Sequence, residues 1–124
     1  MQVNRYLIAT VLVIGVSIAA HLGKFHITLG AHPFWATKAI LFGTPIGLAF
    51  ALGLVRILGR EKWLSAVFAV LMIGAFWVAY SGKIQFAASY AEDIAAGQRW
   101  FFGWIGFCAA FSGLMAALVM IRRD

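Results

Sequence analysis

The stretch LSAVFAVLMIGAFWVAYSG, residues 64–82, decides the fold class because it contains no charged side chain. A helix needs roughly 17–25 predominantly apolar residues to cross the hydrocarbon core of a bilayer. An extended segment with this composition would leave its backbone N–H and C=O groups unpaired in lipid. Residues 64–82 therefore predict a transmembrane helix.

Three further segments have the same character, at residues 6–23, 39–55 and 101–121. Basic and aromatic residues lie where these segments end, as is typical of membrane interfaces. The chain is 64% hydrophobic and 11% charged, and a water-soluble domain of 124 residues has too small a core for such a composition. The sequence predicts an all-α polytopic membrane protein, one membrane domain over residues 1–124 with spans at approximately 6–23, 39–58, 64–82 and 100–121.

The first of these spans has a second interpretation. An apolar run that ends in Ser17, Ala19 and Ala20 is compatible with a secretory signal. Arg5 alone, however, is a thin basic region for such a signal. We expect the segment to be retained as a transmembrane helix.

Basic residues are distributed unevenly between the two sides of the predicted bundle. Because Lys and Arg are enriched in cytoplasmic loops, the richer side predicts that both termini are cytoplasmic in a multi-pass protein of the cell inner membrane. The net charge of +6 then reflects topology and contact with anionic lipid headgroups, and it does not indicate a nucleic-acid partner. The cytoplasmic set is Arg5, Arg56, Arg60, Lys62, Arg122 and Arg123, and the outer set is Lys24, Lys38, Lys83 and Arg99.

The two outer links are longer than the cytoplasmic turn at residues 57–62. The first, residues 24–38, alternates apolar and polar side chains from Phe25 to Gly30, which predicts a short extended stretch on the interface. The His32–Pro33 step then predicts a turn back toward the membrane.

The second outer link, residues 83–99, has helical periodicity. Phe86, Tyr90 and Ile94 share one side, acidic residues lie opposite, and Gly97 suits a helix end. This pattern predicts a short amphipathic outer helix on the membrane surface between the third and fourth spans. The alternative is that the third span simply continues beyond the bilayer.

Small residues recur at four-residue spacing in three of the spans. Such rows let helix backbones approach closely in lipid, where no hydrophobic force drives helices together. Each row either packs inside one bundle or faces another subunit, and their number favours an oligomer or a larger complex. The rows are Gly15, Ala19 and Gly23 in the first span, Gly43, Gly47 and Ala51 in the second, and Gly106, Ala110, Gly113 and Ala117 in the fourth.

Pro45 lies within the second span and has no backbone N–H to donate. Its ring also clashes with the carbonyl of Leu41, so we expect a kink or local widening of the helix. A carbonyl freed at membrane depth can coordinate a cation or substrate. A structural role for Pro45 is the simpler interpretation, since Thr44 can help to satisfy the local backbone.

Histidines are the main candidates for chemistry. His21, His26 and His32 all fall at or beyond the outer end of the first span, and three imidazoles would suit zinc or copper. Their spacing matches no metal motif, and a haem on His21 would lack a second histidine on a facing helix. Histidines that hydrogen-bond to lipid or loop backbone are the alternative. Cys108 is a lone thiol, and the sequence predicts no cofactor.

Three functions remain after these considerations. The apolar spans, short loops and small-residue rows favour a non-catalytic structural subunit of a larger membrane complex of respiratory or photosynthetic type. The first alternative is a small homo-oligomeric channel or transporter. The second, less favoured, is a membrane enzyme that binds metal or haem or modifies lipid. The channel path would involve Ser17, Thr44, Ser65, Ser112 and Pro45, and the enzyme site would be built from His21, His26, His32, Glu92 and Asp93.

Overall fold

The computed structural model describes residues 2–121. It contains α1 (Gln2–Gly23), α2 (Phe25–Thr28), α3 (Ala36–Leu58), α4 (Glu61–Ala88) and α5 (Ile94–Val119), and this part of the chain has no strand. Four of these helices, α1, α3, α4 and α5, are long and apolar enough to cross a membrane. The predicted all-α class with four spanning helices is therefore confirmed.

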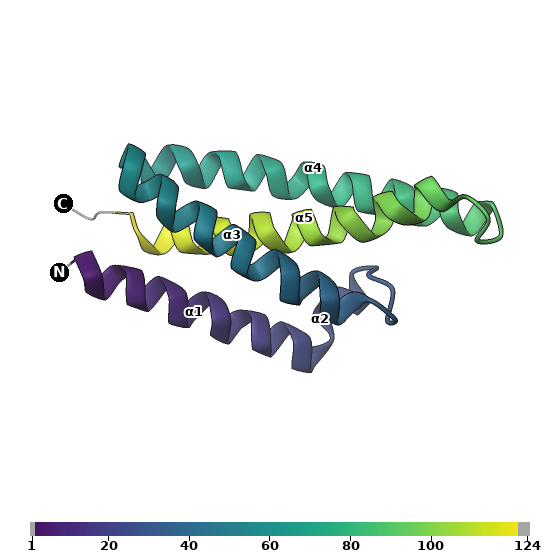
Figure 1. Ribbon diagram of the computed structural model, residues 1–124, viewed down its shortest axis with the longest axis horizontal. Coiled ribbons are helices and arrows are strands. Elements are labelled where there is room, and N and C mark those ends of the chain that lie inside the picture. The colour runs from purple at the N-terminus through teal and green to yellow at the C-terminus, as the bar shows by residue number, and fades with distance from the viewer. Residues whose placement is uncertain (1, 122–124) are drawn as a thin grey trace.

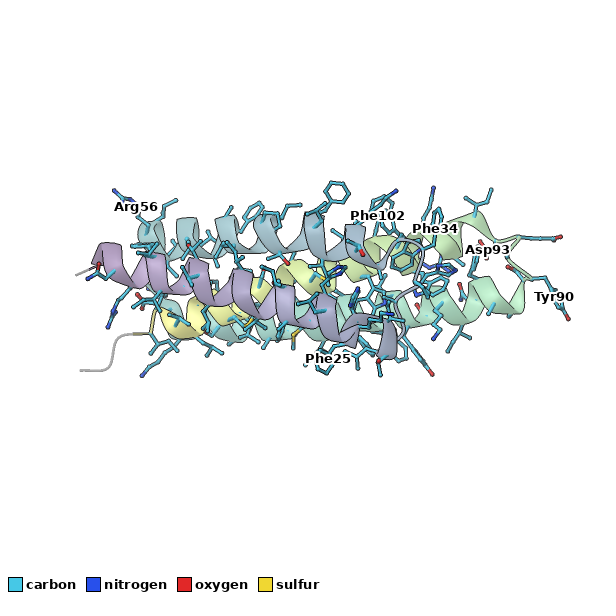
Figure 2. All side chains as sticks on the ribbon, turned by 90° about the horizontal axis from the view of Figure 1, so that it is seen from below. Phe25, Phe34, Arg56, Tyr90, Asp93 and Phe102 are labelled. Carbon is cyan, nitrogen blue, oxygen red and sulfur yellow. The ribbon has the colours of Figure 1, made fainter. Side chains whose placement is uncertain are left out.

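The spanning helices run antiparallel to their neighbours in the chain (Figure 1). Arg56 lies at one end of the bundle, whereas Phe25, Phe34, Tyr90 and Asp93 lie toward the other (Figure 2). We call the latter the outer end, following the prediction above. Helix direction separates the basic residues into the two predicted sets, except that Arg122 and Arg123 lie outside the described residues.

Helix α5 is the centre of the bundle. It packs along both α4 and α3, which barely touch each other. Of the apolar window of α5, 44% of the residues are buried, against 11% for α1. The packing is thus a three-helix unit built around α5, with α1 leaning on one side of it (Figure 1).

The contact between α3 and α5 depends on two glycines. A Cβ atom at Gly43 would lie 2.6 Å from the carbonyl oxygen of Ile105, and one at Gly47 would overlap the carbonyl oxygen of Ala109. Only glycine lets the two backbones come this close. Dispersion contacts between them stabilise the helix pair in lipid, where no hydrophobic force drives helices together.

Glycines also set the distance between α4 and α5. A Cβ atom at Gly82 would lie 2.6 Å from the amide nitrogen of Trp100, and one at Gly103 would lie 2.6 Å from that of Ala79. Neither Gly82 nor Gly103 was singled out in the sequence, because neither has a small residue four positions away. They belong to the same class of contact as Gly43 and Gly47.

The predicted amphipathic helix between the third and fourth spans is wrong as a separate element. Helix α4 continues to Ala88, the chain turns, and α5 begins at Ile94. Ser89 Oγ accepts from the Asp93 amide at 2.9 Å, and Asp93 Oδ1 caps α5 by accepting from the Ala96 amide at 3.0 Å. These two side chains satisfy the turn, and they interrupt the helical pattern that had been extended through them.

Positive backbone angles complete this turn. Tyr90 and Ala91 have φ of 55° and 65°, which is the left-handed region. Gly97, which had been expected to end a helix, lies inside α5 instead, with a Cβ position 3.0 Å from the Phe86 ring. The α4–α5 hairpin therefore has a tight tip, on which Tyr90 and Asp93 are the outermost labelled residues (Figure 2).

The predicted extended stretch in the first outer link is also wrong. Residues Phe25–Thr28 form the single turn α2, started by Lys24 in the left-handed region at φ 56°. Gly30, at φ 123°, then turns the chain toward α3. Helix α3 runs through Pro45 without a break, so the kink stays a prediction.

Candidate functional site

At the outer end of the bundle, one buried indole connects the α2–α3 link to α5. Trp100 of α5 donates from Nε1 to the carbonyl oxygen of Gly30 at 2.9 Å, which ties the α2–α3 link to α5. His32 and Trp35 pack edge-on against the same indole, each with ring centroids 5.2 Å from it. Trp100 therefore holds the link over the outer end of the helices.

A cavity of about 290 Å³ lies beneath this link, between α1, α2, α3 and α5. Its walls are mostly apolar and aromatic, and none of them is an Asp, Glu, Lys or Arg side chain. Mostly apolar walls with a few polar groups are typical of small-molecule sites, although this volume is at the lower limit for them. The polar or polarizable groups on its walls are Ser17, His26, Thr44, Cys108 and the indole of Trp104.

His26 is the unusual residue of this cavity. Its side chain is only 5% exposed, and neither ring nitrogen has a hydrogen-bond partner among residues 2–121. Desolvation by burial and the neighbouring His21 imidazole lower the pKa of His26 from its ordinary value of 6.5, against a smaller opposing interaction with the Ala20 backbone, which lies outside hydrogen-bond geometry. At neutral pH the ring is thus neutral and carries one N–H donor and one acceptor nitrogen.

Ser17 and Thr44 contribute hydroxyl groups to the walls of the same cavity, and the buried Ser112 lies next to them. Ser17 Oγ and Thr44 Oγ1 lie 3.2 Å apart and join α1 to α3. Ser112 Oγ donates to the Thr44 carbonyl oxygen at 3.0 Å. Three of the four hydroxyls assigned to a channel path thus meet at one level, but they hydrogen-bond to one another or to backbone. The fourth, Ser65, donates to the Glu61 carbonyl oxygen at the opposite end.

A second cavity lies on the other side of the hydroxyl pair. It has a volume of about 380 Å³, and its walls also include Ser17 and Thr44. His21 and Pro45 line it, and it is otherwise almost entirely apolar. Helix α1 therefore touches α3 through the Ser17–Thr44 pair, with a space on either side.

The structure does not gather the residues proposed for a metal site. His21 and His26 have ring centroids 6.2 Å apart, but His32 packs against Trp35 and accepts from the Phe34 amide through Nδ1. Within residues 2–121, no group of three His, Cys, Asp or Glu side chains could hold a metal ion. Asp93 lies at the tip of the α4–α5 hairpin (Figure 2), and Glu92 precedes it in the same turn.

The predicted small-residue rows fall into two classes. Gly43, Gly47 and Ala51 of α3 are buried, as are Ala110, Gly113 and Ala117 of α5, while Gly106 meets only the Ala75 methyl at 3.4 Å. Gly15, Ala19 and Gly23 of α1 are exposed, and a Cβ atom at Gly15 would have nothing within 4 Å.

What sequence reasoning missed at this site was the burial of His26. Its position after the first span suggested either a metal ligand or an interfacial residue that hydrogen-bonds to lipid or loop backbone. The helical turn α2 instead places it under the link and against α1. No spacing or neighbour in the sequence signals that arrangement.

Comparison with known proteins adds no relative. No protein-family model, curated protein or solved structure matches the chain. The function must therefore be argued from the residues themselves.

Proposed function

We propose that this protein is a non-catalytic structural subunit of a larger membrane assembly of respiratory or photosynthetic type. In this proposal it is a multi-pass protein of the cell inner membrane with both termini in the cytoplasm, and it contacts neighbouring subunits through α1. The observation that carries the proposal is the uncovered small-residue face of α1.

This face has the composition of a helix–helix interface. Gly15 and Ala19 are exposed on it, and they are flanked at helical spacing by Ile8, Leu12 and Leu22, which are large, apolar and also exposed. Small residues between large ones form a groove with ridges, the geometry through which membrane helices associate. Equivalent glycines in α3 are already used against α5, so the face on α1 is free for another polypeptide.

The test compares two glycines that are equally open inside the chain. Gly15→Leu should release the protein from its assembly, because a leucine there blocks close approach of a partner helix. Gly74→Leu is the matched control, since Gly74 on α4 is exposed and also has nothing within 4 Å. Tagged wild type and both variants would be purified in mild detergent, with native mass and co-purifying chains as the readout.

Each result of that purification decides something. Wild type and Gly74→Leu should be recovered with other membrane polypeptides, and Gly15→Leu alone. Recovery of the wild type as a single stable chain would contradict the proposal. Recovery with copies of itself only would favour the homo-oligomeric channel or transporter over a complex of different subunits.

A further inference from the structure

The inner end of the bundle, opposite the outer end, contains a cavity of a different kind. Helix α1 begins here, the α3–α4 turn lies here, and α5 ends here (Figure 1). The volume of the cavity is about 350 Å³, within the range of roughly 300–1,000 Å³ for small-molecule sites. Unlike the two apolar cavities beside Ser17 and Thr44, it has mostly polar walls. The charged side chains among the described walls are Arg5, Arg56 and Glu61.

These charged side chains lie at the level of the lipid headgroups. Arg5 directly precedes the charge-free segment 6–23, and Arg56 directly follows the segment 39–55. Glu61 is the first residue of α4, three positions before Leu64, where the next charge-free segment begins. Because such segments cross the hydrocarbon core, the side chains at their ends meet the headgroup layer of the bilayer. The cavity therefore adjoins the phosphate groups of the surrounding lipids.

Contacts within the chain hold the cavity open and satisfy its backbone groups. Arg5 donates from Nη1 to the Met120 carbonyl oxygen at 3.5 Å, which places its guanidinium at the end of α5. Tyr6 packs against the buried cluster that contains Val55 and Met120. The Gly59 amide donates to the Val55 carbonyl oxygen at 2.8 Å. Both of these helix-end carbonyls therefore have a donor, and the charged side chains are the groups that a ligand would meet.

The signs of the charges restrict the class of that ligand. Guanidinium groups bind phosphate oxygens through paired N–H donors, so Arg5 and Arg56 favour a phosphate. The Glu61 carboxylate lines the same cavity and would repel a ligand that carries only negative charge. A primary ammonium supplies both a positive charge and N–H donors, whereas the quaternary ammonium of choline has no N–H. A phosphate joined by a short link to a primary ammonium thus matches all three charges.

We propose that this cavity binds the headgroup of phosphatidylethanolamine, with the phosphate on Arg5 and Arg56 and the ammonium on Glu61. The acyl chains of the lipid extend into the bilayer along the apolar surface of the bundle. The proposal does not rest on the assembly role, since the three charged walls belong to this one chain. It also differs from the general attraction of basic residues to anionic lipids, which would favour phosphatidylglycerol.

The direct test compares three lipids on the wild-type protein. Protein in mild detergent would be titrated with phosphatidylethanolamine, phosphatidylcholine and phosphatidylglycerol of identical acyl chains, and native mass spectrometry would count the bound molecules. One phosphatidylethanolamine should bind saturably, about tenfold more tightly than phosphatidylcholine, because choline cannot donate to the carboxylate. Equal affinities of these two lipids would contradict the proposal. Tighter binding of phosphatidylglycerol would overturn it by showing that positive charge alone attracts the lipid.

A soluble ligand distinguishes the whole lipid from its headgroup. The compound sn-glycero-3-phosphoethanolamine carries the same phosphate and ammonium without acyl chains. It should bind at least about tenfold more weakly than the lipid, because it buries no acyl surface against the bundle. An equal affinity would indicate a water-soluble phosphoethanolamine ligand and overturn the assignment to a lipid. Neither this comparison nor the previous one requires a variant, so neither depends on whether a variant folds.

Variants test the role of each charge in the same titration. Glu61→Gln should reduce the preference for phosphatidylethanolamine over phosphatidylcholine to about threefold, because a hydrogen bond to a neutral acceptor is about half as strong. Glu92→Gln, which removes an exposed carboxylate from the outer end, is its control. Arg5→Gln should weaken phosphatidylethanolamine binding about tenfold. Lys62→Gln removes the same charge from an exposed inner position that does not line the cavity, and it should leave the affinity unchanged.

Two results from these variants would contradict the proposal. One is an undiminished preference for phosphatidylethanolamine in Glu61→Gln, since the carboxylate would then have no part in recognising the ammonium. The other is equal weakening by Arg5→Gln and Lys62→Gln, which would mean that the lipid responds to the net charge of the inner end and not to this cavity.

Discussion

Helices α3 and α1 both carry a row of small residues, yet they are held in opposite ways. Along α3, Gly43 and Gly47 bring the backbone into direct contact with α5, and added Cβ atoms would overlap it. Along α1, Gly15 faces open space, and the described side chains buried in the bundle are Ala9 and Val13. The row on α3 is buried against α5, and the row on α1 is exposed.

The largest expected effect follows from the tightest contact. Gly47→Leu should destabilise the bundle by about 3 kcal/mol or more, because neither the Ala109 backbone nor the Ser112 hydroxyl can move away cheaply. Unfolding by sodium dodecyl sulfate, followed by circular dichroism, measures the effect. Gly53→Leu, on the same helix but with nothing within 4 Å, is the control. Equal stability of the two variants would mean that α3 and α5 are not packed backbone to backbone.

A smaller effect is expected between α4 and α5. Gly103→Ala should cost about 2 kcal/mol, since its methyl would lie 2.7 Å from Cα of Ala79. Gly74→Ala, at an open position of α4, should instead be neutral or stabilising by up to about 1 kcal/mol through helix propensity. The same unfolding assay should therefore show a lower stability for Gly103→Ala and an equal or higher stability for Gly74→Ala. A Gly103→Ala protein as stable as Gly74→Ala would disprove the close approach at Ala79.

A smaller effect again is expected in the outer link between α1 and α3. Trp100→Phe keeps an aromatic ring but removes the donor to Gly30, at an expected cost of about 1 kcal/mol. Amide hydrogen exchange of residues 26–31 should then quicken roughly fivefold. Trp77→Phe, at an exposed position on α4, should leave these amides unchanged. Exchange in the link that does not respond to Trp100→Phe would mean that the indole is not its anchor.

The smallest effect is expected where α1 meets α3. Ser17→Ala removes the hydroxyl pair with Thr44 and should cost about 0.6 kcal/mol, the typical value for an interhelical hydrogen bond in a membrane. The distribution of distances between spin labels on α1 and α3 should broaden. Thr10→Val is the control, because the Thr10 hydroxyl donates to Tyr6 within α1 itself. A loss as large as that for Gly47→Leu would show that α1 is held as firmly as α3, and the contrast between them would fail.

Charge-free segments such as residues 64–82 predicted the four spanning helices, because the bilayer imposes one structure on any long apolar run. The helix ends were predicted less well. Ser89 and Asp93 looked like the polar face of a helix, and only their hydrogen bonds reveal a turn. The local sequence alone does not distinguish the polar face of a helix from a turn.

The candidate site was harder to predict for a related reason. Gly15 and Gly47 each belong to a row of small residues at four-residue spacing. Which of the two is buried depends on how closely its helix packs on α5. The same holds for His26, whose burial results from a link folded over the helix ends. Both are properties of tertiary arrangement, which periodicity along one helix does not encode.

The central place of α5 has a consequence for biosynthesis. Chains enter the membrane from the N-terminus onward, so α1, α3 and α4 are inserted before the helix on which α3 and α4 both pack. Until α5 is inserted, the glycine face of α3 lacks the helix against which it packs, and α3 and α4 have almost no contact with each other. Assembly of this bundle must therefore wait for its last helix, and a chain that stops before α5 would offer those unmatched faces to the cell's membrane quality control.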